Sequence, residues 1–285
     1  MSARLLRASR AGALGRGALV HLTLGGYSLL VLCPILLVLL NSFKSRQGIF
    51  DDPLGLPTKA TLSLAGYAKV LGDAGVGQMF MNSAVVTGAA LCAILLLGAM
   101  AAWALTEYGF FGNRLLALFL AFGIMVPIRL GSVAILQEMV ALGLVNTLAA
   151  LVLVYVAQGL PLAVMILSEF VSQVPQELKD AARCDGVGEY RIFFQVVLPL
   201  IRPAVATVAV FTMVPIWNDL WFPLILAPSE QTQTITLGVQ QFVGQFATDW
   251  NAVLAALSLA VLPILVLYAV FSRQLIRGIT AGAVK

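Results

Sequence analysis

The residues best suited to chemistry form a charged segment, Glu177–Pro199, whose sequence is ELKDAARCDGVGEYRIFFQVVLP. The surrounding 34 residues, Glu169–Arg202, hold nine of the 30 charged residues of an otherwise apolar chain. Acidic and basic side chains mixed in so short a stretch favour contact with water and with a partner surface over bond-making chemistry. A solvated connector between two helices is the alternative interpretation.

Two further charges, Arg129 and Asp219, interrupt long apolar runs. Ionisable residues inside a membrane are costly and are functional hypotheses by default. Arg129 is roughly 21 Å along a helix that starts at Leu115, and Asp219 is roughly 24 Å along one that starts at Pro203. Both are therefore expected toward the outer leaflet, where they pair or line one aqueous cavity. The alternative is that each extends separately to the outer interface.

Aromatic and amide side chains surround Asp219 at Trp217, Asn218 and Trp221. Indole rings suit the apolar CH faces of a sugar, and hydrogen-bonding groups suit its hydroxyls. Together with Arg129 and Asp219 they form the candidate translocation path. Tryptophan also anchors helices at membrane interfaces, which is the alternative role.

No pattern typical of catalysis or cofactor binding is present in the sequence. The chain has one histidine, three cysteines without metal-ligand spacing, and no G-x-x-x-x-G-K-[ST] loop to hold ATP. We therefore expect no catalytic residue, no metal site and no cofactor bound by this chain. The net charge of +4 requires no nucleic-acid partner.

Composition indicates an integral membrane protein. Of the 285 residues, 60% are hydrophobic and 11% are charged, whereas about a quarter are charged in ordinary soluble domains. About 20 apolar residues span a bilayer, so an all-α fold with six transmembrane helices is predicted. The expected spans are Leu19–Leu40, Asn82–Thr106, Leu115–Gln137, a span from about Leu148 to Ser168, Pro203–Leu226 and Asn251–Ser272.

Basic residues set the expected orientation, because cytoplasmic loops are enriched in lysine and arginine. A cytoplasmic N-terminus places 12 of the 17 basic residues inside, and both termini then lie in the cytoplasm. Three regions follow: 1–78 with the first span and an extracytoplasmic loop, 79–275 with five spans, and a cytoplasmic tail, 276–285.

Within the charged segment, two short helices separated by a turn are predicted. Pro175 suits the first turn of a helix, and Gly186 suits its end because glycine readily takes a positive φ. A second helix is expected from about Glu189. Leu178, Ala181 and Ala182 share one face by their spacing, so we expect an exposed apolar stripe for a partner. Lys179, Asp180 and Arg183 are expected to flank it.

The same segment resembles the EAA loop of permeases in binding-protein-dependent ABC importers, E-A-A-x-x-x-G-x9-I-x-L-P. Asp180 replaces the glutamate and Val196 the isoleucine; the matching residues are Ala181, Ala182, Gly186, Leu198 and Pro199. The runs WNDLWFPLILA, TLGVQQF and GITAGAVK are similar to the carbohydrate-uptake branch, in particular to the maltose-type second permease.

The resemblance implies a type I importer permease fold with an EAA-type loop at about 174–199 and a cytoplasmic coupling helix. It implies a non-enzymatic subunit in the plasma (inner) membrane of a prokaryote that carries a sugar or polyol. The implied partners are a second homologous permease, two copies of a cytoplasmic ATPase that binds ATP, and an extracytoplasmic solute-binding protein. The implied coupling residues are Asp180, Ala181, Ala182, Asp185, Gly186, Leu198 and Pro199.

Three alternatives remain open. An ion-coupled secondary carrier would need intramembrane acids, of which Asp219 is an example. An ABC permease for a solute other than a sugar would share the loop. A membrane enzyme would need a cluster of histidines and carboxylates.

Overall fold

The computed structural model describes residues 2–72, 74–245 and 249–283, and the chain is helical through most of this part. The only strand-like pairing among the described residues is an isolated bridge between Lys44 and Leu62. The helices are α1 Ser2–Ser42, α2 Arg46–Asp51, α3 Ala65–Gly72, α4 Ala74–Glu107, α5 Asn113–Met125, η1 Ile128–Gly131, α6 Ser132–Ala141, α7 Leu148–Ser172, α8 Gln176–Cys184, α9 Glu189–Ile192, η2 Phe193–Val197, α10 Leu198–Leu200, α11 Arg202–Asn218, α12 Trp221–Leu226, α13 Ile235–Gln245 and α14 Trp250–Ala283.

The chain divides into two compact units, 1–72 with 242–259, and 73–241 with 260–285. In the first unit, α2 and α3 follow α1, and the start of α14 packs with them. Lys44 is fully buried there, and its Nζ donates a hydrogen bond to the carbonyl of Asp52 at 2.6 Å. Lys69 Nζ lies 2.6 Å from Asp249 Oδ2. The segment between the first two predicted spans is therefore ordered around buried and paired lysines.

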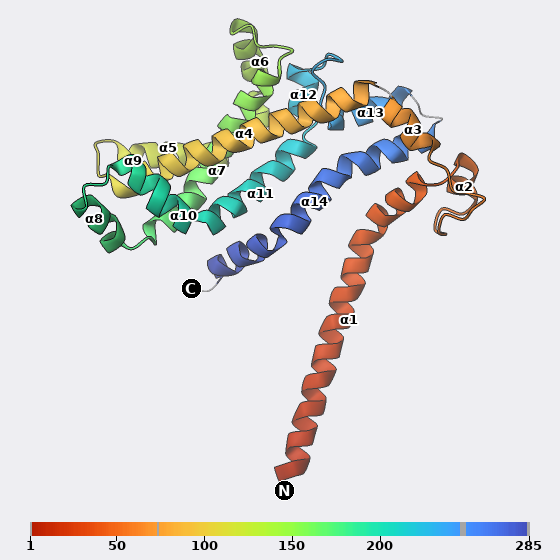
Figure 1. The fold of residues 1–285 in the computed structure, drawn as a ribbon, viewed down its shortest axis with the longest axis horizontal. Coiled ribbons are helices and arrows are strands. Elements are labelled where there is room, and N and C mark those ends of the chain that lie inside the picture. Colours follow the sequence, from red (N-terminus) through yellow and green to blue (C-terminus); the bar gives the residue numbers. More distant parts are fainter. Residues whose placement is uncertain (1, 73, 246–248, 284–285) are drawn as a thin grey trace. The chain divides into compact units, whose positions relative to one another are not determined.

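The core of the second unit is formed by α4, α7 and α11, which lie side by side (Figure 1). Small residues bring α4 and α7 together. A Cβ on Gly98 would lie 2.9 Å from Ala163 Cβ, and one on Gly159 would lie 2.6 Å from Ile94 Cδ1. Helices in a membrane approach closely through such small residues, because they gain little from the hydrophobic effect.

Three described helices are long and apolar enough to cross a membrane: Leu19–Ser42, Gly75–Glu107 and Leu148–Ser172. They confirm the first, second and fourth predicted segments as long apolar helices. A loop over residues 142–147 separates α6 from α7, and Gly143 and Asn146 take positive φ in it.

The expected continuous helix over Leu115–Gln137 is wrong. Its residues fall in α5 and in η1 with α6, two parts that meet at 89°. Pro127 accounts for the break, because proline disfavours the helical conformation of the residue before it, and Val126 is extended with φ −86° and ψ 117°. Arg129 consequently lies in a 3₁₀ turn just after the bend.

A continuous helix over Pro203–Leu226 is wrong as well, since α11 ends at Asn218 and α12 starts at Trp221. Asp219 is extended between them, with φ −70° and ψ 135°. Upstream, the run Glu189–Leu200 meets α11 at 76°, next to Pro203. The last predicted span corresponds to a shorter apolar stretch of α14, Trp250–Val266.

Candidate functional site

The charged segment forms the predicted helix, turn and second helix. Pro175 precedes α8, and Gly186 follows it with a φ of +75°. The amide N–H of Gly186 bonds to the Arg183 carbonyl at 3.0 Å, and that of Val187 to the Ala182 carbonyl at 3.0 Å. Gly186 therefore ends α8 in the left-handed conformation that glycine favours.

Ion pairs attach α8 to the end of α4. Glu107 is the last residue of α4, and its side chain is 6% exposed; it accepts from Lys179 Nζ at 2.5 Å and from Arg183 Nη2 at 2.6 Å. The side chain of Lys179 is 5% exposed, and its Nζ lies 5.4 Å from the centroid of the Trp103 ring. A buried charge is tolerated only when it is paired and hydrogen-bonded, as Lys179 is here.

Arg183 extends this network to α9. Its Nε lies 2.7 Å from Glu189 Oε1 and its Nη1 lies 2.9 Å from Asp180 Oδ1. The hydrogen bonds that Arg183 donates to Glu189 first, and then to Glu107 and Asp180, raise its pKa, so its charge is permanent. We call Glu107, Lys179, Arg183 and Glu189 the coupling cluster, because they join α4, α8 and α9.

The structure corrects the expected faces of α8. Lys179 is buried against α4 rather than flanking an exposed stripe, because Glu107 offers it a buried carboxylate. Ala182 is half-buried against the core. The exposed face instead carries Leu178, which is 47% exposed, and Ala181, with Asp180 beside them. Hydrogen bonds from Gln176 and then Arg183 lower the pKa of Asp180.

The remaining predicted coupling residues lie after α8. Asp185 is exposed and directly follows the helix, while Leu198 and Pro199 are half-buried in α10. A π-helical turn, η2, comes just before them. Proline has no N–H for the usual bond four residues back, which accounts for a locally widened turn here.

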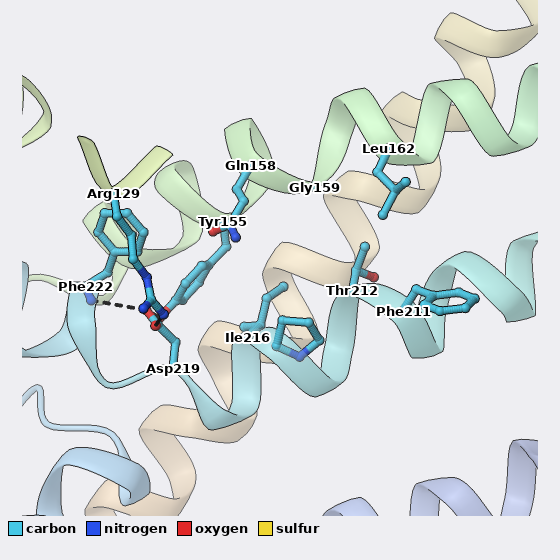
Figure 2. Close-up of a pocket in the computed structure, with 11 residues that line it drawn as sticks. Arg129, Tyr155, Gln158, Gly159, Leu162, Phe211, Thr212, Ile216, Asp219 and Phe222 are labelled. Atoms are coloured by element: carbon cyan, nitrogen blue, oxygen red, sulfur yellow. Dashed lines mark hydrogen bonds and ion pairs between the residues drawn. The ribbon is translucent and has the colours of Figure 1, made fainter. Parts of the chain in front are cut away.

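The second candidate region is the Arg129–Asp219 pair (Figure 2). Arg129 Nη2 lies 3.2 Å from Asp219 Oδ1, so the structure brings the two charges together. The side chain of Asp219 is 8% exposed and that of Arg129 is 66% exposed. A buried carboxylate is thus paired with the guanidinium of a largely exposed side chain.

Asp219 also accepts hydrogen bonds from α7 and from α12. Tyr155 Oη lies 3.0 Å from Oδ2, and the amide nitrogen of Phe222 lies 3.1 Å from the same oxygen. The amide of Trp221 is 3.4 Å from Oδ1. Asp219 therefore accepts from the first two backbone amides of α12 and ties this helix to α7 and η1.

A cavity of about 150 Å³ adjoins this pair. Its lining residues are Arg129, Tyr155, Gln158, Gly159, Leu162, Phe211, Thr212, Pro215, Ile216, Asp219 and Phe222. Two of the five predicted path residues, Arg129 and Asp219, are among them.

The other three path residues lie away from the lining. Trp217 is buried, its Nε1 donates to the Ala260 carbonyl at 3.1 Å, and its ring packs edge-on against Phe80. Asn218 bonds back to its own helix, and Trp221 Nε1 donates to Ser132 Oγ at 2.8 Å. Trp217 and Trp221 thus hold helices together.

Sequence reasoning missed four residues. Tyr155, Gln158 and Thr212 line the cavity, and Glu107 holds α8. The three cavity residues are uncharged and lie in apolar runs, so nothing in their own segments marked them. Of these four residues, Glu107 could have been identified from the sequence, because it is a carboxylate directly after a long apolar run.

Metal-binding geometry is not found in the described ranges: no group of three or more histidine, cysteine, aspartate or glutamate residues lies close enough to hold an ion.

The fold matches solved transport structures. A chain of a bacterial ABC transporter that imports the acidic polysaccharide alginate superimposes with a TM-score of 0.77 at 21% identity, over 94% of this chain and 97% of that one. A second structure, of a bacterial alginate ABC transporter in complex with a periplasmic protein carrying an alginate pentasaccharide, gives a TM-score of 0.66 at 14% identity, over 94% and 96% of the two chains. At these identities the likeness concerns the fold.

Sequence comparisons extend along the chain. A diacetylchitobiose uptake system permease protein of Streptomyces coelicolor is 34% identical over 98% of this chain and 92% of that relative. A melibiose/raffinose/stachyose import permease protein of Bacillus subtilis is 31% identical over 88% and 91%. The family model for the inner membrane component of binding-protein-dependent transport systems matches residues 94–281.

That match covers most of the chain, including both candidate regions, and the relatives are permease proteins rather than enzymes. The chain therefore belongs to the family of binding-protein-dependent transport system inner membrane components, as an ABC importer permease of the carbohydrate-uptake branch.

Proposed function

We propose that this chain forms half of the translocation path for a sugar or related polyol, and that it receives the work of ATP hydrolysis through α8. The observation that carries the proposal is the way α8 is held. Its inner side is fixed to α4 by Glu107, Lys179 and Arg183, while Leu178 and Ala181 remain exposed.

A helix held in this way suits the transmission of force. A partner shifts a two-state protein only by as much as it prefers one state over the other. An ATPase that grips α8 differently with and without ATP would move α4 with it, because buried ion pairs join the two helices. The small side chain of Ala181 lets a partner backbone approach α8 closely.

The proposed topology has six spans with both termini in the cytoplasm. Regions 1–78 and 79–275 then hold the first span and the five-span transport domain, with the EAA-type loop at about 174–199. The tail 276–285 lies on the ATPase side. The bent pair Asn113–Met125 with Ile128–Ala141 counts as one span, α11 with α12 as another, and α14 supplies the last.

The proposed assembly contains a second homologous permease, two copies of an ATPase that binds ATP, and an extracytoplasmic solute-binding protein. The family description, which names a binding-protein-dependent system, supports the last partner, as does the related alginate transporter with its periplasmic protein bound. The names of relatives that carry diacetylchitobiose, melibiose or starch degradation products support a carbohydrate cargo.

The experiment is reconstitution of the permease pair, ATPase and binding protein encoded by neighbouring genes into proteoliposomes, with sugar uptake measured with and without ATP. We expect uptake to require ATP, and Gly186→Pro to remove both ATPase association and uptake, because proline cannot take a φ of +75°. Uptake driven by an ion gradient without ATP would instead support a secondary carrier. Intact ATPase association in Gly186→Pro would refute the docking role of α8.

A further inference from the structure

We propose that the cavity beside Asp219 binds one neutral, hydroxyl-rich sugar ring and discriminates against a ring that carries a carboxylate. This inference rests on the proposed function, in that it assigns a ligand class to the candidate translocation path. It follows from the charge balance of the cavity, from the donors and acceptors that remain free, and from its size.

The charges in the cavity cancel. Of the described residues that line it, only Arg129 and Asp219 are acidic or basic, and they lie 3.2 Å apart. An anionic ligand at the guanidinium would therefore be attracted by Arg129 and repelled by Asp219 from nearly the same place. Opposite charges this close leave a dipole rather than a net positive field.

A ligand carboxylate cannot displace the Asp219 carboxylate from its hydrogen-bond donors without a large cost. It accepts from Arg129, from Tyr155 Oη at 3.0 Å and from the Phe222 amide at 3.1 Å, and it is buried. Removing it from these donors would leave buried polar groups without an acceptor, which costs the full desolvation of each group. The carboxylate is therefore a fixed part of the cavity wall.

Hydroxyl groups, in contrast, find partners that are still available. Among the described residues, Arg129 makes one ion pair, through Nη2. Its side chain is 66% exposed, so its other N–H groups are accessible to a ligand. Gln158 adds an exposed amide that can donate and accept (Figure 2). Thr212 Oγ1 donates to the Val208 carbonyl at 2.8 Å and keeps its lone pairs for a donor.

Apolar surface and size complete the site. Phe211, which is 48% exposed, contributes an aromatic ring to the lining, and Leu162 contributes an aliphatic side chain; Phe222 is 2% exposed and lies behind this surface. Such surfaces suit the CH faces of a pyranose ring. A cavity of about 150 Å³ is on the scale of one six-membered ring, since an engineered cavity of that volume binds benzene, and an adjoining hollow of about 630 Å³ shares Arg129, Gln158 and Leu162 with it.

The test uses sugars that differ only at C6. The assembled permease and ATPase complex, without binding protein, is placed in lipid nanodiscs, and affinities for glucose against glucuronate and for galactose against galacturonate are measured by saturation-transfer NMR. We expect the wild type to bind the neutral member of each pair more tightly. Omitting the binding protein isolates the selectivity of the permease.

Three variants separate charge from shape. Asp219→Asn keeps the size of the side chain and an acceptor oxygen but leaves Arg129 unbalanced, so we expect the preference to shift toward the uronates by about tenfold. Asp219→Asn combined with Arg129→Gln is neutral again and should lose that shift. Glu230→Gln removes an exposed carboxylate outside the lining and should match the wild type.

Assembly of each variant is verified by size-exclusion chromatography before binding is measured. Equal affinities for both members of each pair in the wild type, or an Asp219→Asn complex that assembles without any shift toward uronates, would overturn the inference. If Asp219→Asn fails to assemble, Arg129→Gln provides the test. The Asp219 carboxylate is then unpaired, so uronate binding should weaken further relative to the neutral sugars. An unchanged ratio of the two affinities would overturn the inference. Neither result would affect the ATP dependence of uptake, which tests the proposed function.

Discussion

Two groups of charged residues in this chain differ in how far their side chains are paired and exposed. In the coupling cluster, Glu107 and Glu189 face Lys179 and Arg183, and each basic residue contacts at least one carboxylate within 2.7 Å. At the cavity, Asp219 has several donors, but Arg129 keeps most of its guanidinium exposed. The charges of the first group are paired with one another, and the second group leaves hydrogen-bonding capacity for a ligand.

The difference suggests how one helical fold separates two tasks. A network of paired charges joins α4, α8 and α9, which suits the transfer of movement. An open pair holds α12 in place through Asp219 while Arg129 faces the cavity, which suits contact with a passing solute. Four sets of substitutions test this contrast, from the largest expected effect to the smallest.

Replacing Glu107 with alanine should have the largest effect. The substitution leaves Lys179 charged and buried without a carboxylate, for which we expect a loss of about 3–5 kcal/mol in stability. Thermal unfolding of the purified permease complex measures this loss. Glu107→Gln combined with Lys179→Met should lose less than Glu107→Ala, because no unpaired ammonium group remains. Unfolding of Glu107→Ala at the wild-type temperature would show that the cluster does not hold α8.

Substitutions at the Asp219 site should cost less, because Arg129 can stay in water. We expect Asp219→Ala to lose about 2–3 kcal/mol, since Tyr155 and the amide of Phe222 lose their acceptor, and Tyr155→Phe to lose about 1 kcal/mol. The same unfolding assay compares them. If Tyr155→Phe destabilises the complex as much as Asp219→Ala, the carboxylate is not the centre of this site.

The turn after α8 offers a matched pair of glycines. Gly186 has a φ of +75° and Gly188 a φ of −69°, and a Cβ would meet nothing within 4 Å at either position. Gly186→Ala should therefore cost about 1–2 kcal/mol through backbone strain alone, and Gly188→Ala should be neutral or slightly stabilising. Equal unfolding temperatures for the two variants would contradict the left-handed turn.

The smallest effect should come from Asp180, whose side chain is exposed. Its pKa is lowered by hydrogen bonds from Gln176 and Arg183, so its contribution to stability is present above the pKa of the unfolded chain. That contribution is lost as the pH falls through the lower pKa of the folded state. Gln176→Ala should raise the pKa toward its usual value, measured by NMR with carboxyl-labelled aspartate. An unchanged pKa of Asp180 in Gln176→Ala would show that Gln176 does not lower it.

Several features of the fold could be predicted from short stretches of the sequence alone. Gly186 was identified as the end of α8 because a positive φ is a property of one residue and its neighbours, and long apolar runs identified the helices α1, α4 and α7. The bends were not predicted, since hydropathy carries no information on direction. Pro127 lies at the break between α5 and η1, but the 89° angle there depends on packing.

Contacts between distant residues account for the rest. Lys179 was expected at the surface because its partner, Glu107, lies 72 residues earlier in the chain. Trp217 and Trp221 were expected on the path because indoles suit sugars, whereas their N–H groups bond to Ala260 and Ser132. Arg129 and Asp219 were recognised because charge in an apolar segment is rare whatever the fold.

The central claim is that the exposed face of α8 docks an ATPase. Its most direct test is co-purification of the ATPase with a permease complex that carries Ala181→Trp, compared with Ala60→Trp. Both alanines are exposed, and Ala60 lies in the loop proposed to be extracytoplasmic. The account predicts that Ala181→Trp assembles with the second permease but loses the ATPase, whereas Ala60→Trp keeps it. An ATPase that co-purifies equally with both variants would contradict the claim.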